Sequence, residues 1–412
     1  NNTIRNCNIS CGAPQHTGTL VTFGILIGGT TISATATTGL DNDNNSIIDN
    51  YIIKARNGIC TRGAGATNLN QNTIITGNLI GPASFGSDAI GVAGMLLQFE
   101  NNCNVSQNEV RFVGGDFANT SAGADRIGIG LGTTTWSNTS ATTTTNTNFI
   151  CSRNLIHDII EERTFSAVGI LCGTTNGGSP TNNTVCDNMI YHVKANGTSG
   201  DCVSGIGISG GHSDQIVNNS IYLYGDVDPN SLASTPSMMG WGIRISTANT
   251  ASFTNLNLRN NIVYMNLSSS SAAGARFYAI GAPTAAYSFG TGGCNNNNYY
   301  IDPLNSQLRI GGFSTSSALA ATTEFASLPL WQTAFTVPQD AASLSLDPGY
   351  TSLTDLHISL GNPNMNDVGA PAFCGVDFDG DTRSGTPDLG ADEYTPVLCA
   401  GNDGGIVTPS TV

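Results

Sequence analysis

The sequence predicts an all-β solenoid, in which about eight or nine short coils stack into a single-stranded parallel β-helix and an irregular C-terminal segment closes it. An apolar kernel with an asparagine recurs about every thirty to forty residues, which is typical of a solenoid whose insertions loop outward. Leu, Glu and Lys are scarce, Gly numbers 50 among 412 residues, and few windows have a 3.6-residue period. These features disfavour helices.

Each kernel is a short apolar strand that reaches an asparagine and continues into a second apolar pair, as in the segment Ile47-Ile48-Asp49-Asn50-Tyr51-Ile52. Asparagine tolerates a left-handed backbone, so we expect it to turn a corner there. If the coils are in register, the side-chain amides will hydrogen-bond from coil to coil. The repeat asparagines are Asn6, Asn50, Asn78, Asn108, Asn154, Asn188, Asn219, Asn261 and Asn298.

A second landmark precedes each later kernel: a glycine followed by alternating apolar residues. Examples are Gly24-Ile25-Leu26-Ile27, Gly169-Ile170-Leu171 and Gly242-Ile243-Arg244-Ile245. Alternation of this kind predicts short strands that point every second side chain into the core. Each coil therefore has at least two strands, and stacking on neighbouring coils stabilises them.

Tyrosines accompany several kernels. Tyr191, Tyr222 and Tyr264 each come three residues after a repeat asparagine, which predicts a stack of rings. Two interpretations are open: a structural stack in the core or at its edge, or an exposed platform for sugar rings.

With these kernels, residues 1–300 resemble the pectin-lyase-like superfamily of β-helices. That resemblance and the usual handedness of parallel crossovers imply right-handed coils. We expect parallel coils over 1–300, the end of the solenoid with a closing motif over 301–396, and a linker toward a following module over 397–412. Ser316 to Trp331 is the best candidate for a helical or irregular turn.

The C-terminal motif consists of Val376-Asp377-Phe378-Asp379-Gly380-Asp381-Thr382-Arg383 and Pro387-Asp388-Leu389-Gly390-Ala391-Asp392-Glu393-Tyr394. It resembles the closing segment of secreted β-helix proteins of Bacteroidetes. The resemblance implies a bacterial cell-surface, adhesin-like protein exported by the type IX route. The chain begins within a kernel and shows no signal peptide, so we expect it to be a piece of a longer multi-domain protein.

The charge of the chain excludes several classes of partner. The net charge is −15, and the only lysines are Lys54 and Lys194. Nucleic acids and anionic membrane surfaces are bound mainly through basic patches, so we expect neither. No run of eighteen apolar residues is present, which argues against membrane insertion. A polyanionic substrate would need a metal ion to offset the repulsion.

The 11 cysteines cannot all pair within the chain. Cys103, Cys151 and Cys186 lie in or beside kernels, where we expect small buried side chains. Cys374 and Cys399 flank the C-terminal motif and are the better candidates for a disulfide.

The same motif is a candidate calcium site. Asp377, Asp379 and Asp381 place three carboxylates around Gly380, and calcium prefers oxygen ligands. However, the glycine comes two places early for a standard calcium loop and no glutamate follows at the usual distance. The alternative is a turn in which Arg383 neutralises one of the aspartates.

Candidate catalytic residues gather in the middle coils; they are His157, Asp158, Glu161, Glu162, Arg163, His192, Lys194, Asp201, His212 and Arg244. A lyase needs a base and a cation that neutralises a uronate, and Lys194 with Arg163 and Arg244 could supply them. Each of these residues could equally be a solvated surface group.

Two fragments resemble the polygalacturonase family: Gly200-Asp201-Cys202 with Gly210-Gly211-His212, and Gly242-Ile243-Arg244-Ile245-Ser246. Cys202 replaces that family's second aspartate, and Ser246 stands where its lysine would be. An inverting hydrolase needs two carboxyl groups, so the fragments do not predict one. We therefore expect a non-catalytic extracellular module that binds polysaccharide or other cell-surface material. The alternative is a polysaccharide lyase or glycoside hydrolase.

Overall fold

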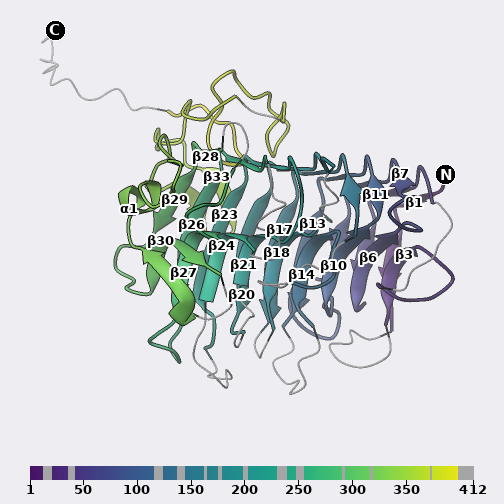
Figure 1. Cartoon of the computed structure of the whole chain (residues 1–412). Coiled ribbons are helices and arrows are strands. Elements are labelled where there is room, and N and C mark those ends of the chain that lie inside the picture. Colours follow the sequence, from purple (N-terminus) through teal and green to yellow (C-terminus); the bar gives the residue numbers. More distant parts are fainter. Residues whose placement is uncertain are drawn as a thin grey trace, which may run out of the picture.

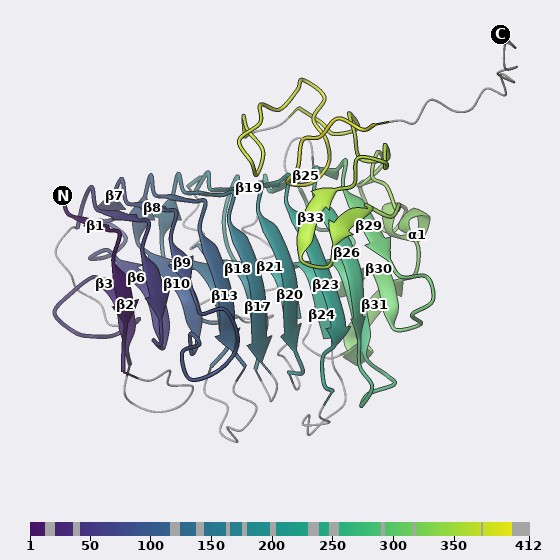
Figure 2. The same cartoon turned by 180° about the vertical axis from the view of Figure 1, so that it is seen from behind.

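The chain folds into a right-handed parallel β-helix of nine coils, as predicted (Figures 1 and 2). The computed structural model describes residues 1–12, 21–35, 42–115, 124–136, 144–161, 165–174, 179–197, 203–229, 239–246, 255–289, 293–315, 319–371 and 374–397. The expected linker after Val397, its first residue, and Cys399 lie outside these residues. We number the coils 1 to 9 in chain order.

Three parallel sheets run along the solenoid, and each coil contributes one strand to each of them. Sheet A contains β1 (Thr3–Arg5), β4 (Ser46–Ile48), β8 (Ile74–Thr76), β12 (Asn104–Ser106), β16 (Ile150–Ser152), β19 (Thr184–Cys186), β22 (Gln215–Val217), β25 (Asn257–Arg259) and β28 (Cys294–Asn295). Sheet B contains β2 (Asn8–Ser10), β5 (Tyr51–Ile53), β9 (Leu79–Ile80), β13 (Glu109–Gly114), β17 (Leu155–Glu161), β20 (Met189–Ala195), β23 (Ser220–Asp226), β26 (Ile262–Ser268) and β29 (Asn298–Ile301). Sheet C contains β3 (Phe23–Ile27), β6 (Asn57–Arg62), β10 (Ala93–Gln98), β14 (Arg126–Leu131), β18 (Ala167–Cys172), β21 (Val203–Ile208), β24 (Met239–Ile245), β27 (Arg276–Ala282) and β30 (Leu308–Ser314).

The remaining elements are short. Sheet E contains β7 (Asn70–Gln71), β11 (Glu100–Asn101) and β15 (Asn146–Thr147), at the corner that precedes sheet A. After β30 come the 3-10 helix η2 (Leu319–Ala321), β31 (Thr322–Phe325), α1 (Leu328–Gln332), β32 (Tyr350–Ser352) and β33 (Asp355–Ile358). The turn expected around Ser316 to Trp331 thus contains η2, an antiparallel strand and the first residues of α1.

A continuous apolar core fills the solenoid because equivalent positions of successive coils stack in register. In sheet A, Ile47, Ile75, Val105 and Cys151 form one such column, and each is fully buried. Burying a Val or Ile side chain contributes about 1.5–3 kcal/mol relative to exposure. The sheet A strands are at most three residues long, so they depend on this stacking for their stability.

The repeat asparagines form a buried ladder at the corner between sheets A and B. The Asn78 Nδ2 donates to Oδ1 of Asn108 at 2.9 Å, and the Asn108 Nδ2 donates to Oδ1 of Asn154 at 3.0 Å. Each amide also donates to a backbone carbonyl of the preceding coil, as Asn154 does to Val105 at 3.0 Å. The predicted coil-to-coil hydrogen bonds are confirmed.

The backbone conformation at this corner corrects one detail of the prediction. The left-handed residue is the one before the ladder asparagine: φ is 54° at Asp49 and 58° at Arg153. In coil 1, Asn6 holds this left-handed position (φ 55°), and Cys7 stands in the ladder. In coil 9 the ladder residue is Asn297 rather than Asn298.

The glycine landmark also has a structural reason. A Cβ on Gly128 of β14 would lie 2.4 Å from the carbonyl oxygen of Gly169 and 2.6 Å from Cγ2 of Ile156. Gly94 and Gly205 face equivalent obstacles in their coils. The column of glycines therefore lets sheet C pass close to the apolar side chains of sheet B.

The closing segment, residues 345–397, folds back along the solenoid instead of extending beyond its last coil (Figures 1 and 2). It lies over the asparagine corner, where the Asn260 Nδ2 donates to the Ala370 carbonyl at 2.8 Å and the Asn218 Nδ2 to the Asp388 carbonyl at 3.2 Å. The Arg153 Nε donates to the Phe378 carbonyl at 3.0 Å. Asn296 of coil 9 donates to the Val368 carbonyl at 3.2 Å, so this segment binds the side of coils 5 to 9.

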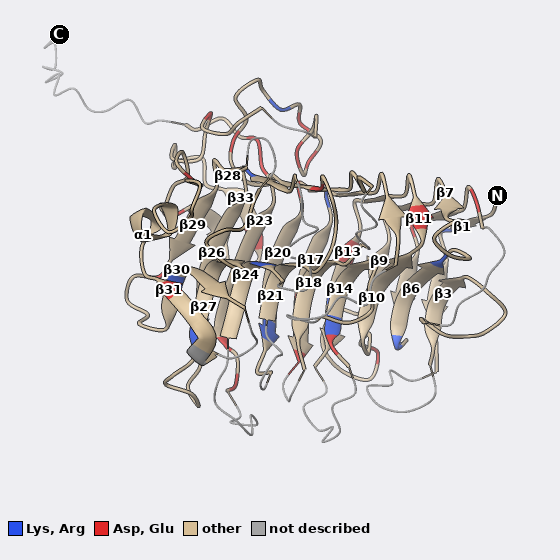
Figure 3. Cartoon of the chain, in the orientation of Figure 1, with Lys and Arg blue, Asp and Glu red and all other residues tan. Residues whose placement is uncertain are grey.

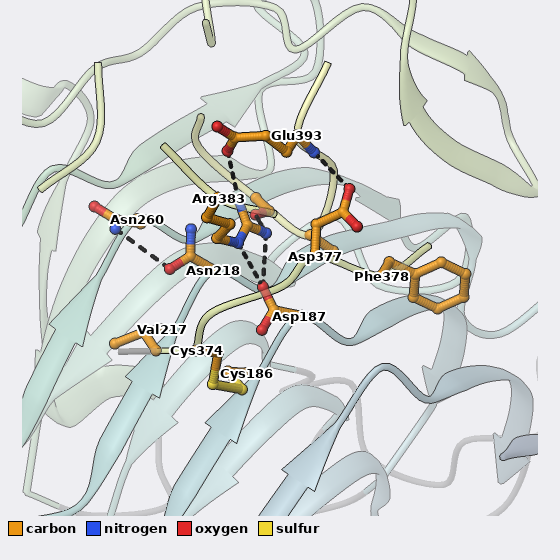
Figure 4. A network of polar contacts seen from close by, with 12 residues as sticks. Cys186, Asp187, Val217, Asn218, Asn260, Cys374, Asp377, Phe378, Arg383 and Glu393 are labelled. Carbon is orange, nitrogen blue, oxygen red and sulfur yellow. Dashed lines mark hydrogen bonds and ion pairs between the residues drawn. A yellow bond between two sulfur atoms is a disulfide. The ribbon is translucent and has the colours of Figure 1, made fainter. Parts of the chain in front are cut away.

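A buried ion pair and a disulfide fasten the closing segment to coil 6 (Figure 4). Arg383 donates to Oδ1 of Asp187 at 2.6 and 2.9 Å, and its Nη1 donates to Glu393 at 3.2 Å. Cys374 pairs with Cys186. Cys186 is buried, as expected, but its pairing was not foreseen: the closing segment brings Cys374 against the end of β19.

The C-terminal end of the solenoid is covered by an aromatic cluster. The fully buried Trp331 of α1 packs against Phe313, Phe325 and Phe335 and donates its Nε1 hydrogen to Oδ2 of Asp340 at 2.8 Å. β31 pairs antiparallel with β30, so the parallel pairing of sheet C stops there.

Candidate functional site

A row of ionisable side chains crosses the middle of sheet B, on strands of coils 4 to 6. In β13, Arg111 pairs with Glu109 at 2.7 Å. The Glu109 carboxylate lies 3.3 Å from Nε2 of His157 in β17, whose Nδ1 lies 2.6 Å from Asp158. Asp158 pairs in turn with Nδ1 of His192 in β20 at 2.5 Å. We call these five residues the sheet B row.

The strands bend where they carry the row. Phe112, Asp158 and His192 have φ values of 49°, 54° and 51°, and they occupy the same place in successive coils. The register pairs Arg111 with His157 and Val113 with Ile159, and leaves Phe112 and Asp158 out of the ladder. Asp and His are among the non-glycine residues that tolerate this conformation. The bend brings consecutive residues, His157 and Asp158, into one polar row.

The hydrogen bonds along the row shift the pKa values of its members. Burial alone would lower the pKa of His157, but hydrogen bonds to Asp158 and Glu109 outweigh it and raise that pKa. Burial would raise the pKa of Asp158, but the two histidines hold it below its usual range. The pKa of Glu109 is lowered, chiefly by its hydrogen bond to His157. The two carboxylates therefore stabilise the charged form of the His157 imidazole.

His192 stands at the open end of the row. Its ring stacks on Tyr224 with centroids 5.0 Å apart, and its side chain is 23% exposed. Among the described residues, no hydrogen bond engages its Nε2. Asp158 therefore orients an imidazole whose second nitrogen is available to a bound molecule.

The predicted tyrosine stack is present in part next to the row, because Tyr222 and Tyr264 stack on each other while Tyr191 stacks on His157. Tyr222 and Tyr264 stack at 4.4 Å, Tyr264 meets Tyr300 edge to face at 4.8 Å, and His157 stacks on Tyr191 at 4.7 Å. Tyr191 and Tyr222 are buried and belong to an apolar cluster with Leu356 and Ala391 of the closing segment. The geometry favours the structural interpretation of this stack over a platform for sugar rings.

Of the catalytic candidates that the structure describes, it brings together His157, Asp158 and His192. Glu161 is buried and accepts a hydrogen bond from the Phe165 amide at 3.0 Å, while Lys194 donates to the Asp226 carbonyl at 3.3 Å. His212 lies in the corner before β22 of sheet A, and its backbone amide donates to Oγ1 of Thr181. Glu162, Arg163 and Asp201 lie outside the described residues.

Arg244 has a structural role instead. It is fully buried in β24, lies over the Trp241 ring at 4.4 Å and donates to the carbonyls of Ala282 at 3.2 Å and Ser314 at 2.8 Å. A guanidinium held in this way cannot neutralise a substrate at the sheet B row.

Acidic residues recur along the closing segment (red in Figure 3), and the three aspartates of its acidic motif have different surroundings. The buried Asp377 accepts the backbone amides of Gly380 at 2.8 Å and Asp381 at 2.7 Å through Oδ1, and that of Glu393 at 2.9 Å through Oδ2. Asp379 faces His357 at 3.0 Å, and Asp381 is exposed. Arg383 pairs with Asp187 and Glu393, outside this trio. Of the three residues predicted to bind calcium, Asp377 thus already has both carboxylate oxygens hydrogen-bonded to backbone amides.

Sequence reasoning missed Glu109 and Arg111. Both follow Asn108 in the kernel at alternate positions, Glu109-Val110-Arg111, and this alternation already indicates that they face away from the core. Their link to His157 could not be foreseen without the register between β13 and β17.

No described helix is long and apolar enough to cross a membrane. Comparison of the sequence with models of known protein families gives no match, and comparison with curated proteins gives none either.

Proposed function

We propose that the chain is a non-catalytic extracellular module of a large secreted or cell-surface bacterial protein, and that its sheet B row binds a neutral carbohydrate. The observation that carries the proposal is the row itself, in which cationic and anionic groups alternate on a partly exposed sheet. Carbohydrate hydroxyl groups both donate and accept hydrogen bonds, so such a row offers them partners of both kinds.

The charge of the row supports a neutral rather than an acidic ligand. Arg111 is neutralised by Glu109, and His157 is held between Glu109 and Asp158. The whole chain carries −15, so a polyanion would be repelled.

The spacing of the row supports an elongated ligand. Its members lie on three adjacent parallel strands, about 4.8 Å apart from one coil to the next. A chain that runs along the solenoid axis would meet Arg111, then Asp158, then His192, which are all partly exposed. The exposed ends of Glu109 and His192 would make its first contacts.

Two observations support an extracellular location. The Cys186–Cys374 disulfide is of the kind that persists in oxidising compartments. The closing motif resembles that of secreted Bacteroidetes proteins, which implies export by the type IX route and attachment within a longer adhesin-like chain.

Binding to a panel of neutral and uronic-acid polysaccharides, measured by calorimetry, tests the ligand. We expect a neutral polysaccharide to bind, and His192→Asn and Arg111→Ala to weaken it at least tenfold. Lys54→Asn is the matched control, because Lys54 holds the same left-handed position in coil 2 (φ 57°), away from the row. Binding that all three variants retain would refute the assignment of the row.

The alternative is a glycoside hydrolase or lyase acting at the same place. The Asp158–His192 pair favours it, because an aspartate that orients an imidazole is a common arrangement for a general base. Incubation with the same polysaccharides, followed by assays for reducing ends and unsaturated products, separates the two functions. Product formation that is lost in His192→Asn would replace the non-catalytic proposal with this one.

A further inference from the structure

We propose that the closing segment contains a binding site for a divalent transition-metal ion of the zinc class, formed by His357, Asp379 and Asp392. This set shares only Asp379 with the aspartate trio in which the sequence suggests calcium. The side chains come from two parts of the closing segment: His357 from β33, and the two aspartates from the acidic motif.

The ligand atoms converge on one point. One ring nitrogen of His357, one Asp379 oxygen and one Asp392 oxygen all lie within 4.8 Å of one another. Nε2 of His357 and Oδ2 of Asp379 are 3.0 Å apart. Two ligand atoms on a tetrahedral zinc ion are about 3.3 Å apart, given metal–ligand distances near 2.0–2.1 Å. Small side-chain movements would therefore suffice to coordinate an ion.

A further carboxylate, that of Asp355, orients the histidine. Nδ1 of His357 hydrogen-bonds to Oδ1 of Asp355, and Oδ1 also accepts the His357 amide at 3.2 Å. A histidine that ligates a metal through one nitrogen commonly donates its other N–H to a carboxylate in this way. The edge-to-face contact with Phe378, at 5.9 Å, further restricts the ring.

Asp392 supplies an anchored, buried ligand. It is 7% exposed, and its Oδ2 accepts the Ile358 amide at 2.8 Å. No described residue donates a hydrogen bond to its Oδ1. The Asp379 and His357 side chains are more open, at 54% and 34% exposure, so an ion could enter from solvent and keep a water as its fourth ligand.

The donor set decides the class of ion. An imidazole nitrogen with two carboxylates suits zinc and similar ions, whereas calcium takes oxygen ligands only and in larger number. The ion would tie β33 to the acidic motif, and so fix the fold of the segment that covers Tyr191 and Tyr222.

Calorimetric titration of the full chain with Zn²⁺, after removal of bound metal by a chelator, tests the site. We expect one ion per chain, no comparable binding of Ca²⁺, and a Tm that rises with Zn²⁺. His357→Ala should abolish this binding, and Asp379→Asn, at an exposed position that the fold does not need, should weaken it at least tenfold. Asp355→Asn should weaken it by about 10–100-fold.

Two control variants, His192→Ala and His212→Ala, should bind Zn²⁺ as the unaltered chain does, because their histidines lie elsewhere. Co²⁺ substitution gives an independent readout, since its visible absorption reports the ligands directly. Unchanged Zn²⁺ affinity in both His357→Ala and Asp379→Asn would mean an adventitious ion only and would overturn the proposal. Loss of binding in His192→Ala would overturn it as well, by moving the ion to the sheet B row.

Discussion

At the scale of single residues, the ladder asparagines do more than fill a corner. Asn154 is fully buried, and its amide joins coils 4, 5 and 6: it accepts from Asn108 and donates to Asn188 at 2.9 Å and to Val105 at 3.0 Å. A polar group left buried without a partner costs about 1–3 kcal/mol.

Asn154→Ala should therefore lower the free energy of unfolding by at least that amount, measured by urea denaturation. Asn104→Ala, at an exposed position of β12 in the neighbouring coil, is the control and should change it by less than about 0.5 kcal/mol. Ligand binding at the sheet B row should persist in folded Asn154→Ala. Equal effects of the two substitutions would contradict the role assigned to the ladder.

The sheet B row predicts how stability depends on pH. The pKa of His157 is raised in the folded chain, so its stabilising effect is complete below its ordinary pKa, about 6.5, and is lost as the pH rises through the folded value. The pKa of Asp158 is lowered, so its contribution is present above about 3.9 and is lost as the pH falls through the folded value.

The destabilisation caused by His157→Phe, which keeps an aromatic ring against Tyr191, should be larger at pH 5.5 than at pH 9. Chemical denaturation of both proteins at the two values measures the difference. An equal loss of stability at both would show that His157 contributes through packing rather than through its charge.

At the scale of elements, the kernels predicted the strands of sheets A and B well, because a strand and its ladder residue are local features of the sequence. The error of one residue at Asn298 arose because four asparagines in a row, Asn295 to Asn298, make the position of the ladder residue ambiguous in the sequence. Only the hydrogen bonds to coil 8 single out Asn297.

The motif of the closing segment could be recognised in the sequence, but its position on the solenoid could not be predicted. Its contacts join residues far apart in the sequence: Cys186 and Cys374 are 188 residues apart, and Arg383 meets Asp187. Nothing in the spacing of these residues distinguishes that pairing from a link between Cys374 and Cys399. The sheet B row was incomplete for a similar reason, since the bend at Asp158 appears only in the backbone.

The disulfide should hold the closing segment on the solenoid. Removing a native disulfide commonly costs about 2–5 kcal/mol. Cys374→Ala should therefore expose residues 345–397 to limited proteolysis, while coils 1 to 4 resist cleavage as before. Cys60→Ala, which removes a buried unpaired cysteine, is the control. Unchanged cleavage in Cys374→Ala would show that the Arg383 contacts suffice.

At the scale of the whole molecule, the solenoid is stabilised unevenly. The closing segment contacts coils 5 to 9 through Arg153, Asp187, Asn218, Asn260 and Asn296. None of the described contacts of this segment reaches coils 1 to 3. In a solenoid each coil is stabilised mainly by its neighbours, so added contacts act locally.

Amide hydrogen exchange should therefore be slowest in the sheet A strands of coils 6 to 8 and faster in those of coils 1 to 3. Truncation after residue 344 should remove this difference. Uniform protection in the full chain would mean that the coils open together as one unit.

The pairing of β31 with β30 has a consequence for association. Open edges of parallel strands are templates on which another chain can add, and β-rich proteins aggregate by that route. β31 occupies this edge with a strand of opposite direction, and the side chains of Trp331 and Phe335 cover the core behind it. A second molecule therefore cannot pair its own first coil with β30 and continue the parallel pairing of sheet C, which disfavours end-to-end fibres through this face.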